Sequence, residues 1–177
     1  MKVLVTGRGG QLAWELEKTA PEGIELVSLS SKELDITSQQ QILDAVSLYA
    51  PELIINAAGY TAVDKAETDP LAYEVNHKGS EYLAYVCDKA DIPLVHISTD
   101  FVFDGTKTTP YQPDEEPSPI NAYGDSKLKG EREITRILGN KATIIRTGWL
   151  YSTHGNNFVK TMLRLMAEKD QLGVVAD

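Results

Sequence analysis

Short apolar runs alternate with longer amphipathic stretches along the whole chain. We interpret the apolar runs as strands at residues 3–5, 26–29, 53–55, 94–97, 142–146 and 174–176. The stretches with helical spacing lie between them, at residues 11–19, 38–49, 70–89, 122–138 and 157–169. Strands that are buried on both faces and separated by helices form a parallel sheet with helices on both sides. The sequence therefore predicts an α/β fold, a Rossmann-type doubly wound parallel sheet of six strands, as one domain over residues 1–177.

Composition and charge exclude several classes of partner. The 177 residues are enough for one domain with a sizeable core, and an apolar fraction of 42% is ordinary for a globular protein. The 17 basic and 26 acidic residues give a formal net charge of −9. Nucleic acids and anionic membranes both favour a basic surface, so neither is an expected partner.

Cysteine and histidine usage argues against a metal site. The single cysteine, Cys87, excludes an internal disulfide and a zinc site built from cysteines. His77, His96 and His154 are scattered without ligand spacing, so no metal is predicted and these side chains are expected in the core or at the surface. The start of the chain lacks the long apolar core of a signal peptide, and no run reaches transmembrane length, which makes the cytoplasm the expected location.

A glycine-rich turn, Thr6-Gly7-Arg8-Gly9-Gly10-Gln11-Leu12-Ala13, joins the first predicted strand to the first predicted helix. Gly7 permits a tight turn, Gly10 lets the backbone approach a pyrophosphate, and Ala13 allows close packing of helix on strand. The N-terminus of the following helix favours a negative charge. The turn predicts dinucleotide binding, although its spacing is Gly-x-x-Gly-x-x-Ala, and an ordinary β–α turn is the alternative.

The residues after the second strand indicate which dinucleotide is bound. An NAD site usually has an acidic residue there, which holds the ribose hydroxyls. Ser30-Ser31-Lys32 contains none, and Arg8 lies in the glycine turn. These groups would bind a 2′-phosphate, so the sequence favours NADPH over NADH. The alternative is that Arg8 and Lys32 are solvated surface charges.

Two further segments are placed to contact the cofactor. Asp35, in Leu34-Asp35-Ile36-Thr37, would accept a hydrogen bond from the adenine amino group, and helix capping near Thr37 is the alternative. Asn56-Ala57-Ala58-Gly59 ends the third strand with small side chains. These leave room for the cofactor backbone, and close packing of a helix on the sheet would need the same residues.

Tyr123 and Lys127 are four residues apart, on one face of the helix predicted at 122–138. Tyr85 and Lys89 have the same spacing, so spacing alone does not identify the site. The first pair opens the helix after the fourth strand, at the carboxyl ends of the strands, where ligands of this fold bind. The second pair lies at the amino ends, so we expect only Tyr123 and Lys127 to meet a nicotinamide.

These residue types suit the reduction of a carbonyl group. A carbonyl that accepts a hydride also needs a proton, which Tyr123 can donate if the Lys127 ammonium lowers its pKa. Lys127 would also reach the ribose hydroxyls. Thr99, in Ser98-Thr99-Asp100, offers a hydroxyl for the carbonyl oxygen, and backbone bonding at the strand end is the alternative. Asn76 either supports this site from a neighbouring helix or serves in capping or packing.

These motifs together resemble the extended short-chain dehydrogenase/reductase family. Within that family, the dTDP-4-dehydrorhamnose reductases are the most similar, through GQL (10–12), TAVDKAE (61–67), STDFVFDG (98–105), RTGWLY (146–151) and NFVKTM (157–162). The resemblance implies NAD(P)H-dependent reduction of the 4-keto group of dTDP-4-dehydro-L-rhamnose to dTDP-L-rhamnose. This reaction belongs to dTDP-rhamnose biosynthesis for cell-surface or spore-coat polysaccharide.

The resemblance also implies a role for each matching residue. Tyr123 would be the proton donor, Lys127 its partner and Thr99 the hydroxyl that binds the carbonyl. Thr99, Asp100 and Trp149 would contact the sugar nucleotide. The cofactor would contact Gly7, Gly10, Gln11, Leu12, Asp35, Ile36, Ala58, Gly59, Tyr60, Tyr123 and Lys127.

The chain departs from the family at three places. Ala13 stands where the family usually has a glycine, and Gly59 where it commonly has an alanine. Family members continue beyond the position of Asp177 into a substrate-binding region, so we expect residues 1–177 to hold the cofactor half and the catalytic residues without that region.

Other functions stay open on the sequence alone. A non-catalytic nucleotide-binding regulatory subunit is one, although an intact set of Thr99, Tyr123 and Lys127 favours an enzyme. A related nucleotide-sugar dehydratase or epimerase is another, but Asp100-Phe101 does not supply the Asp-Glu pair expected of a dehydratase. The sequence does not decide whether the chain forms a homodimer or binds a divalent ion.

Overall fold

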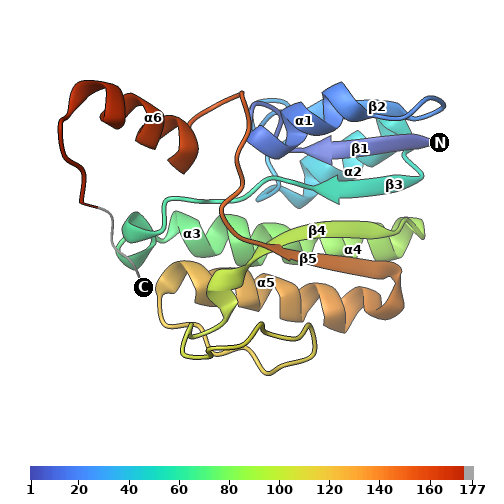
Figure 1. Ribbon diagram of the computed structural model, residues 1–177. Coiled ribbons are helices and arrows are strands. Elements are labelled where there is room, and N and C mark those ends of the chain that lie inside the picture. Colours follow the sequence, from blue (N-terminus) through green and yellow to red (C-terminus); the bar gives the residue numbers. More distant parts are fainter. Residues whose placement is uncertain (174–177) are drawn as a thin grey trace.

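A five-stranded parallel sheet forms the centre of the fold (Figure 1). The computed structural model describes residues 1–173, so the strand predicted at 174–176 lies outside the described residues. The strands are β1 (Lys2–Thr6), β2 (Glu25–Leu29), β3 (Leu53–Asn56), β4 (Leu94–Thr99) and β5 (Ala142–Thr147), in the order β2-β1-β3-β4-β5. All four pairings are parallel, as the both-face apolar runs predicted.

Helices cover both faces of this sheet, which confirms the doubly wound α/β fold. They are α1 (Gln11–Thr19), α2 (Gln39–Tyr49), α3 (Leu71–Tyr73), α4 (Ser80–Ala90), α5 (Ala122–Leu138) and α6 (Phe158–Glu168). Short turns of 3-10 helix are η1 (Asp64–Glu67), η3 (Asp100–Val102) and η4 (Gly139–Lys141). Within residues 1–173, no helix has both the length and the apolar composition needed to cross a bilayer.

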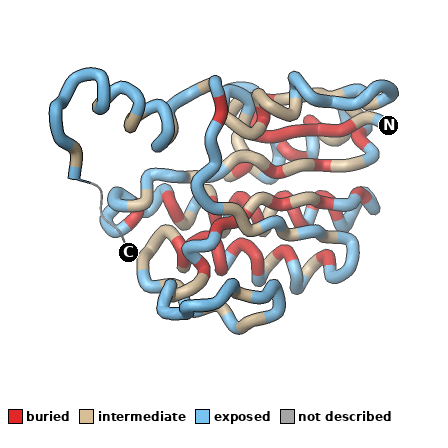
Figure 2. Tube along the Cα trace, in the orientation of Figure 1, coloured by how far each residue is buried: buried red, intermediate tan, exposed pale blue. Residues whose placement is uncertain are grey.

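Alternate residues of each strand separate the core into two clusters. Leu4 and Ile54 point to one face, where they pack with side chains of α2, α4 and α5 such as Ile134. Val3 and Val5 point to the other face, against α1. Figure 2 shows these buried residues along the central strands and on the helix surfaces that face them. Because neighbouring strands are parallel, their carboxyl ends lie along one edge of the sheet.

The helix predicted at residues 70–89 is confirmed, since residues 71–90 are helical throughout, but it contains a π-helical turn that the sequence did not predict. A π-helical turn, η2 (Glu74–Gly79), separates α3 from α4. At this turn the backbone of α5 comes so close that a Cβ on Gly130 would lie 2.2 Å from the carbonyl oxygen of Asn76. Turns of this kind are frequent at functional sites because they re-aim side chains.

The segment from 148 to 157 returns from β5 to the start of α1 (Figure 1). The rings of His154 and Trp14 stack with centroids 5.2 Å apart, and Asn157 donates from Nδ2 to Oε1 of Gln11 at 2.9 Å. Asn157 also caps α6, whose described residues are all at least partly exposed. The segment therefore passes beside the glycine-rich turn.

Candidate active site

A cleft of about 800 Å³ opens at the carboxyl ends of the strands. It contains the switch point between β1 and β3, where the strand order reverses and ligands of doubly wound folds bind. Most of the site residues named from the sequence line it: Gly7, Arg8, Gly10, Gln11, Leu12, Ser31, Asp35, Ile36, Ala58, Gly59, Tyr60, Thr99, Asp100, Tyr123, Lys127 and Trp149. Ser30, Lys32 and Asn76 are not among its described lining residues. Tyr85 and Lys89 are absent from the described lining. The choice between the two Tyr-Lys pairs therefore agrees with the geometry.

The glycine turn forms one wall of this cleft. Gly7 has φ +81°, and a Cβ there would lie 2.8 Å from the backbone of Ala57, so β1 and the end of β3 approach each other through the missing side chain. Gly10 precedes α1 and has no side chain, which leaves the first amide groups of the helix available to an anion. A pyrophosphate fits this arrangement of bare backbone and helix N-terminus.

A chain of buried polar side chains runs beneath the cleft, across three strands. Thr6 donates from Oγ1 to Oδ1 of Asn56 at 2.6 Å, and Ala58 donates its backbone N–H to the same hydroxyl at 3.1 Å. Asn56 lies 3.0 Å from Nδ1 of His96, which is fully buried. Burial, with the nearby charge of Lys127, holds the pKa of His96 well below its usual value. His96 is thus a neutral core residue, as expected, and the chain fixes the loop that carries Ala58.

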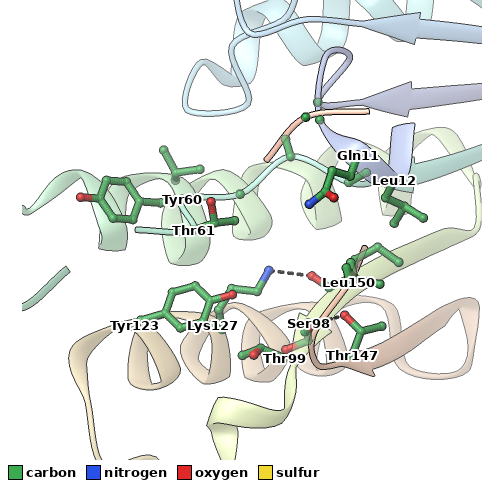
Figure 3. Close-up of a pocket in the computed structure, with 18 of the residues that line it drawn as sticks. Gln11, Leu12, Tyr60, Thr61, Ser98, Thr99, Tyr123, Lys127, Thr147 and Leu150 are labelled. Atoms are coloured by element: carbon green, nitrogen blue, oxygen red, sulfur yellow. Dashed lines mark hydrogen bonds between the residues drawn. The ribbon is translucent and has the colours of Figure 1, made fainter. Parts of the chain in front are cut away.

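Tyr123, Lys127 and Thr99 lie near one another in the cleft (Figure 3). Asn121 begins α5 by accepting the backbone N–H of Gly124 at 2.7 Å, which places Tyr123 in the first turn and Lys127 one turn later. Thr99 ends β4 and donates from Oγ1 to the carboxylate of Asp100 at 3.0 Å. Its hydroxyl also accepts the backbone N–H of Phe101 at 3.2 Å, so the backbone-bonding alternative is correct. Thr99 lines the cleft as well, although it is only 4% exposed.

The ionisation of the Tyr-Lys pair differs from the sequence prediction. Burial raises the pKa of Tyr123, and the Asp100 carboxylate adds to that rise, whereas the Thr99 hydroxyl acts in the opposite direction. Lys127 is not among the groups that shift the Tyr123 pKa, and its ammonium donates to the carbonyl of Ile97 at 2.6 Å (Figure 3). Burial lowers the pKa of Lys127 to about 8, opposed by the charge of Glu131. At neutral pH Tyr123 is protonated and Lys127 is charged.

Asn76 connects the two sides of the cleft, a role that the sequence left open. Its amide accepts the backbone N–H of Tyr60 at 2.9 Å and donates to the carbonyl of the same residue at 3.1 Å. It also donates to Oγ of Ser126 at 3.0 Å, one residue before Lys127. The π-helical turn aims this amide, so Asn76 holds the loop after β3 against α5.

The residues after β2 are arranged differently from the prediction. Arg8 and Ser30 both bond to the carboxylate of Glu33, an acidic residue that follows the three positions considered in the sequence. Asp35 accepts the N–H and the hydroxyl of Thr37 at 2.9 and 2.7 Å, so its carboxylate closes a turn before α2. The helix cap itself is Ser38. The sequence signal for Glu33 was present, because an acidic residue soon after the second strand is typical of ribose binding.

Trp149 lies at the rim of the cleft. Its side chain is 76% exposed and meets the ring of Phe158 edge-on, with centroids 4.9 Å apart. It has φ +53°, an unusual conformation for a large residue. An exposed aromatic ring at the mouth of a cleft offers a stacking surface to a ring of a ligand.

Comparison with known proteins supports the same family. The chain matches the family described as RmlD substrate binding domain over residues 1–177. It is 42% identical to the dTDP-4-dehydrorhamnose reductase of Sinorhizobium fredii, covering 100% of this chain and 60% of that protein. It is also 42% identical to the spore coat polysaccharide biosynthesis protein SpsK of Bacillus subtilis, covering 99% of this chain and 62% of that protein.

A solved structure agrees with these relatives. The dTDP-4-dehydrorhamnose reductase of Bacillus anthracis, crystallised in complex with NADP, superposes with a TM-score of 0.93 at 40% identity. The match covers 97% of this chain and 61% of that one. The chain thus spans about 60% of the length of the curated relatives it matches. The family resemblance drawn from the motifs is confirmed.

Proposed function

Because the chain belongs to the RmlD substrate-binding-domain family, we propose that residues 1–177 are the cofactor-binding and catalytic part of an NAD(P)H-dependent dTDP-4-dehydrorhamnose reductase. The reaction is reduction of the 4-keto group of dTDP-4-dehydro-L-rhamnose to dTDP-L-rhamnose, in the cytoplasm, as a step toward polysaccharide. The main support for this proposal is that one cleft is lined by Thr99, Tyr123 and Lys127 and by the glycine turn.

The cofactor fits the wall made by the turn. The backbone from Gly7 to Leu12 and the N-terminus of α1 would hold the pyrophosphate. Ala58, Gly59 and Tyr60 would line the path toward the nicotinamide, which supplies the hydride when the cofactor is bound. Lys127 would bind the ribose hydroxyls through the ammonium that now donates to Ile97.

The protein itself would supply the proton that the reduction needs. The Thr99 hydroxyl would orient the keto oxygen, and the O–H bond of Tyr123 would break as a new O–H bond forms on the sugar. The raised pKa of Tyr123 keeps that proton in place at neutral pH until negative charge develops on the oxygen. The charged Lys127 would stabilise the tyrosinate that remains only once its ammonium turns from the Ile97 carbonyl toward the cleft, and solvent would return the proton.

Substrate contacts fall on the opposite rim. Trp149 would stack on a ring of the dTDP-sugar, and Asp100 would accept hydrogen bonds from sugar hydroxyls. Asp100 is exposed and accepts only the neighbouring threonine hydroxyl among its described side-chain partners, which leaves it acceptor capacity for a ligand.

Isotope transfer tests the proposal. With deuterium on C4 of NADPH and dTDP-4-dehydro-L-rhamnose as substrate, the label should appear on C4 of the product sugar. Tyr123→Phe should suppress the transfer while leaving cofactor binding intact. Cofactor binding without label transfer, when the chain is supplied as part of the full-length protein, would instead support a regulatory subunit. Conversion of the substrate without net NADPH consumption would support an epimerase. Light scattering on the same samples separates a monomer from a homodimer.

A further inference from the structure

An ion pair joins the loops after β1 and β2 beside the cleft, through Arg8, which lines the cleft, and Glu33, which is not among its lining residues. Nη2 of Arg8, in the glycine turn, lies 2.6 Å from Oε2 of Glu33 and 2.7 Å from its Oε1. The same carboxylate accepts the backbone N–H of Ser30 at 2.9 Å and its hydroxyl at 2.6 Å. Glu33 is therefore held by three donor groups from two different loops.

This cluster lies where proteins of this fold recognise the adenosine ribose of a dinucleotide. In doubly wound folds that bind dinucleotides, an acidic residue after the second strand accepts the ribose 2′-hydroxyl of NAD, whereas an arginine nearby accommodates the 2′-phosphate of NADP. This chain has both groups at that place, and they are bonded to each other. The backbone of Arg8 is itself fixed there, because its N–H donates to the carbonyl of Leu29 at 3.0 Å.

We propose that Glu33 sets the cofactor preference of this chain, because its carboxylate occupies the two groups, Arg8 and Ser30, that a 2′-phosphate requires. A 2′-hydroxyl can donate to Glu33 with the cluster intact. A 2′-phosphate binds only when Glu33 leaves Arg8. The inference rests on the proposed dinucleotide binding and adds the residue that discriminates between the two cofactors.

Charge and exposure decide how strong this discrimination is. Hydrogen bonds from Ser30, followed by the charge of Arg8, lower the pKa of Glu33, so the carboxylate is ionised at neutral pH and repels a phosphate. The side chains of Arg8 and Glu33 are 46% and 41% exposed, and an ion pair in such a setting is weak. A phosphate carries more charge than a carboxylate and can therefore displace it. Glu33 reduces the preference for a 2′-phosphate without preventing its binding.

Calorimetry with two small ligands tests this directly. Adenosine 2′,5′-bisphosphate and AMP differ only in the 2′-phosphate, so the ratio of their Kd values isolates that group from the rest of the cofactor. Glu33→Gln keeps the size and acceptor oxygen of the side chain but removes its charge. Glu25→Gln is the matched control, because Glu25 lies at the opposite end of β2 and pairs with Lys2 at 3.2 Å.

Glu33→Gln should tighten the bisphosphate by about tenfold and leave AMP within about twofold, a change the size of one charge-assisted hydrogen bond. Arg8→Gln should weaken the bisphosphate by about tenfold, and Glu25→Gln should change neither ligand. NAD⁺ and NADP⁺ should follow AMP and the bisphosphate. An unchanged ratio in Glu33→Gln, with normal NAD⁺ binding, would overturn this inference alone. Absence of NAD⁺ and AMP binding in the wild-type protein would overturn the proposed function and this inference with it.

Discussion

Replacing Lys127 by methionine should make the protein more stable at neutral pH. The side chain is 4% exposed and its ammonium donates to one neutral carbonyl, that of Ile97. Burial lowers its pKa from 10.5 to about 8, which at about 1.4 kcal/mol for each pH unit is a cost of roughly 3 kcal/mol for folding with the charge. Methionine has a similar length and no charge. It leaves the Ile97 carbonyl without its donor, which costs about 1 kcal/mol, so the net gain is about 2 kcal/mol.

The dependence of that gain on pH is the sharper test. Between about pH 8 and 10.5 the unfolded wild-type chain keeps the Lys127 proton that the folded chain has lost, so wild-type stability rises with pH in this window. The advantage of Lys127→Met should therefore shrink over the same range and end as a deficit of about 1 kcal/mol, the cost of the lost hydrogen bond to Ile97. Urea unfolding at a series of pH values measures it, with Lys89→Met, an exposed lysine on α4, as the control that stays within about 0.5 kcal/mol. A Lys127→Met protein that is less stable than wild type at neutral pH, or a gain that does not vary with pH, would refute the reasoning.

Three further outcomes are expected. Gly7→Ala should lose at least about 2 kcal/mol of unfolding free energy, measured by denaturant titration, because φ +81° and a 2.8 Å backbone contact leave no room for a methyl group. The same substitution should weaken NAD⁺ binding, measured by calorimetry. Tyr123→Phe should lower kcat by about 10²–10⁴-fold with little change in cofactor Kd, whereas Tyr85→Phe should match wild type, and equal losses would contradict the assignment. Glu131→Gln should lose about 2 kcal/mol in thermal unfolding, because it breaks the ion pair of a nearly buried carboxylate with Arg146 at 2.7 Å.

The described strands were predictable because each one contains a short apolar run, even at the edges of the sheet, where β2 and β5 are only partly buried. The predicted runs at 3–5 and 94–97 lie within β1 (Lys2–Thr6) and β4 (Leu94–Thr99), and the structure extends them by one or two residues. The edge of the sheet then follows from topology, since parallel strands bring their carboxyl ends together. That is why Thr99 and Tyr123, far from the glycine turn in sequence, could be placed on one cleft.

The features that the sequence did not predict depend on contacts between segments that are distant in the chain. The π-helical turn at 74–79 lies where the backbone of Gly130 comes close, and local helical spacing carries no sign of that approach. The influence of Lys127 on Tyr123 depends on where one flexible side chain points, which the spacing of the pair does not fix. Glu33 was overlooked because the cofactor prediction stopped at Lys32, although its pairing with Arg8 links two loops.

The π-helical turn imposes a constraint of length rather than of composition. A π turn holds one residue more than the α-helical path between the same two ends. Deleting one residue between 74 and 79 would therefore leave an uninterrupted α-helix in which α3 and α4 keep their relative orientation. Tyr73, whose hydroxyl donates to Asp125 at 2.7 Å, would keep its place beside α5. Asn76 would instead lose the wide turn that aims its amide at Tyr60 and Ser126, so a single deletion here would loosen the loop after β3 without disturbing the rest of the helix.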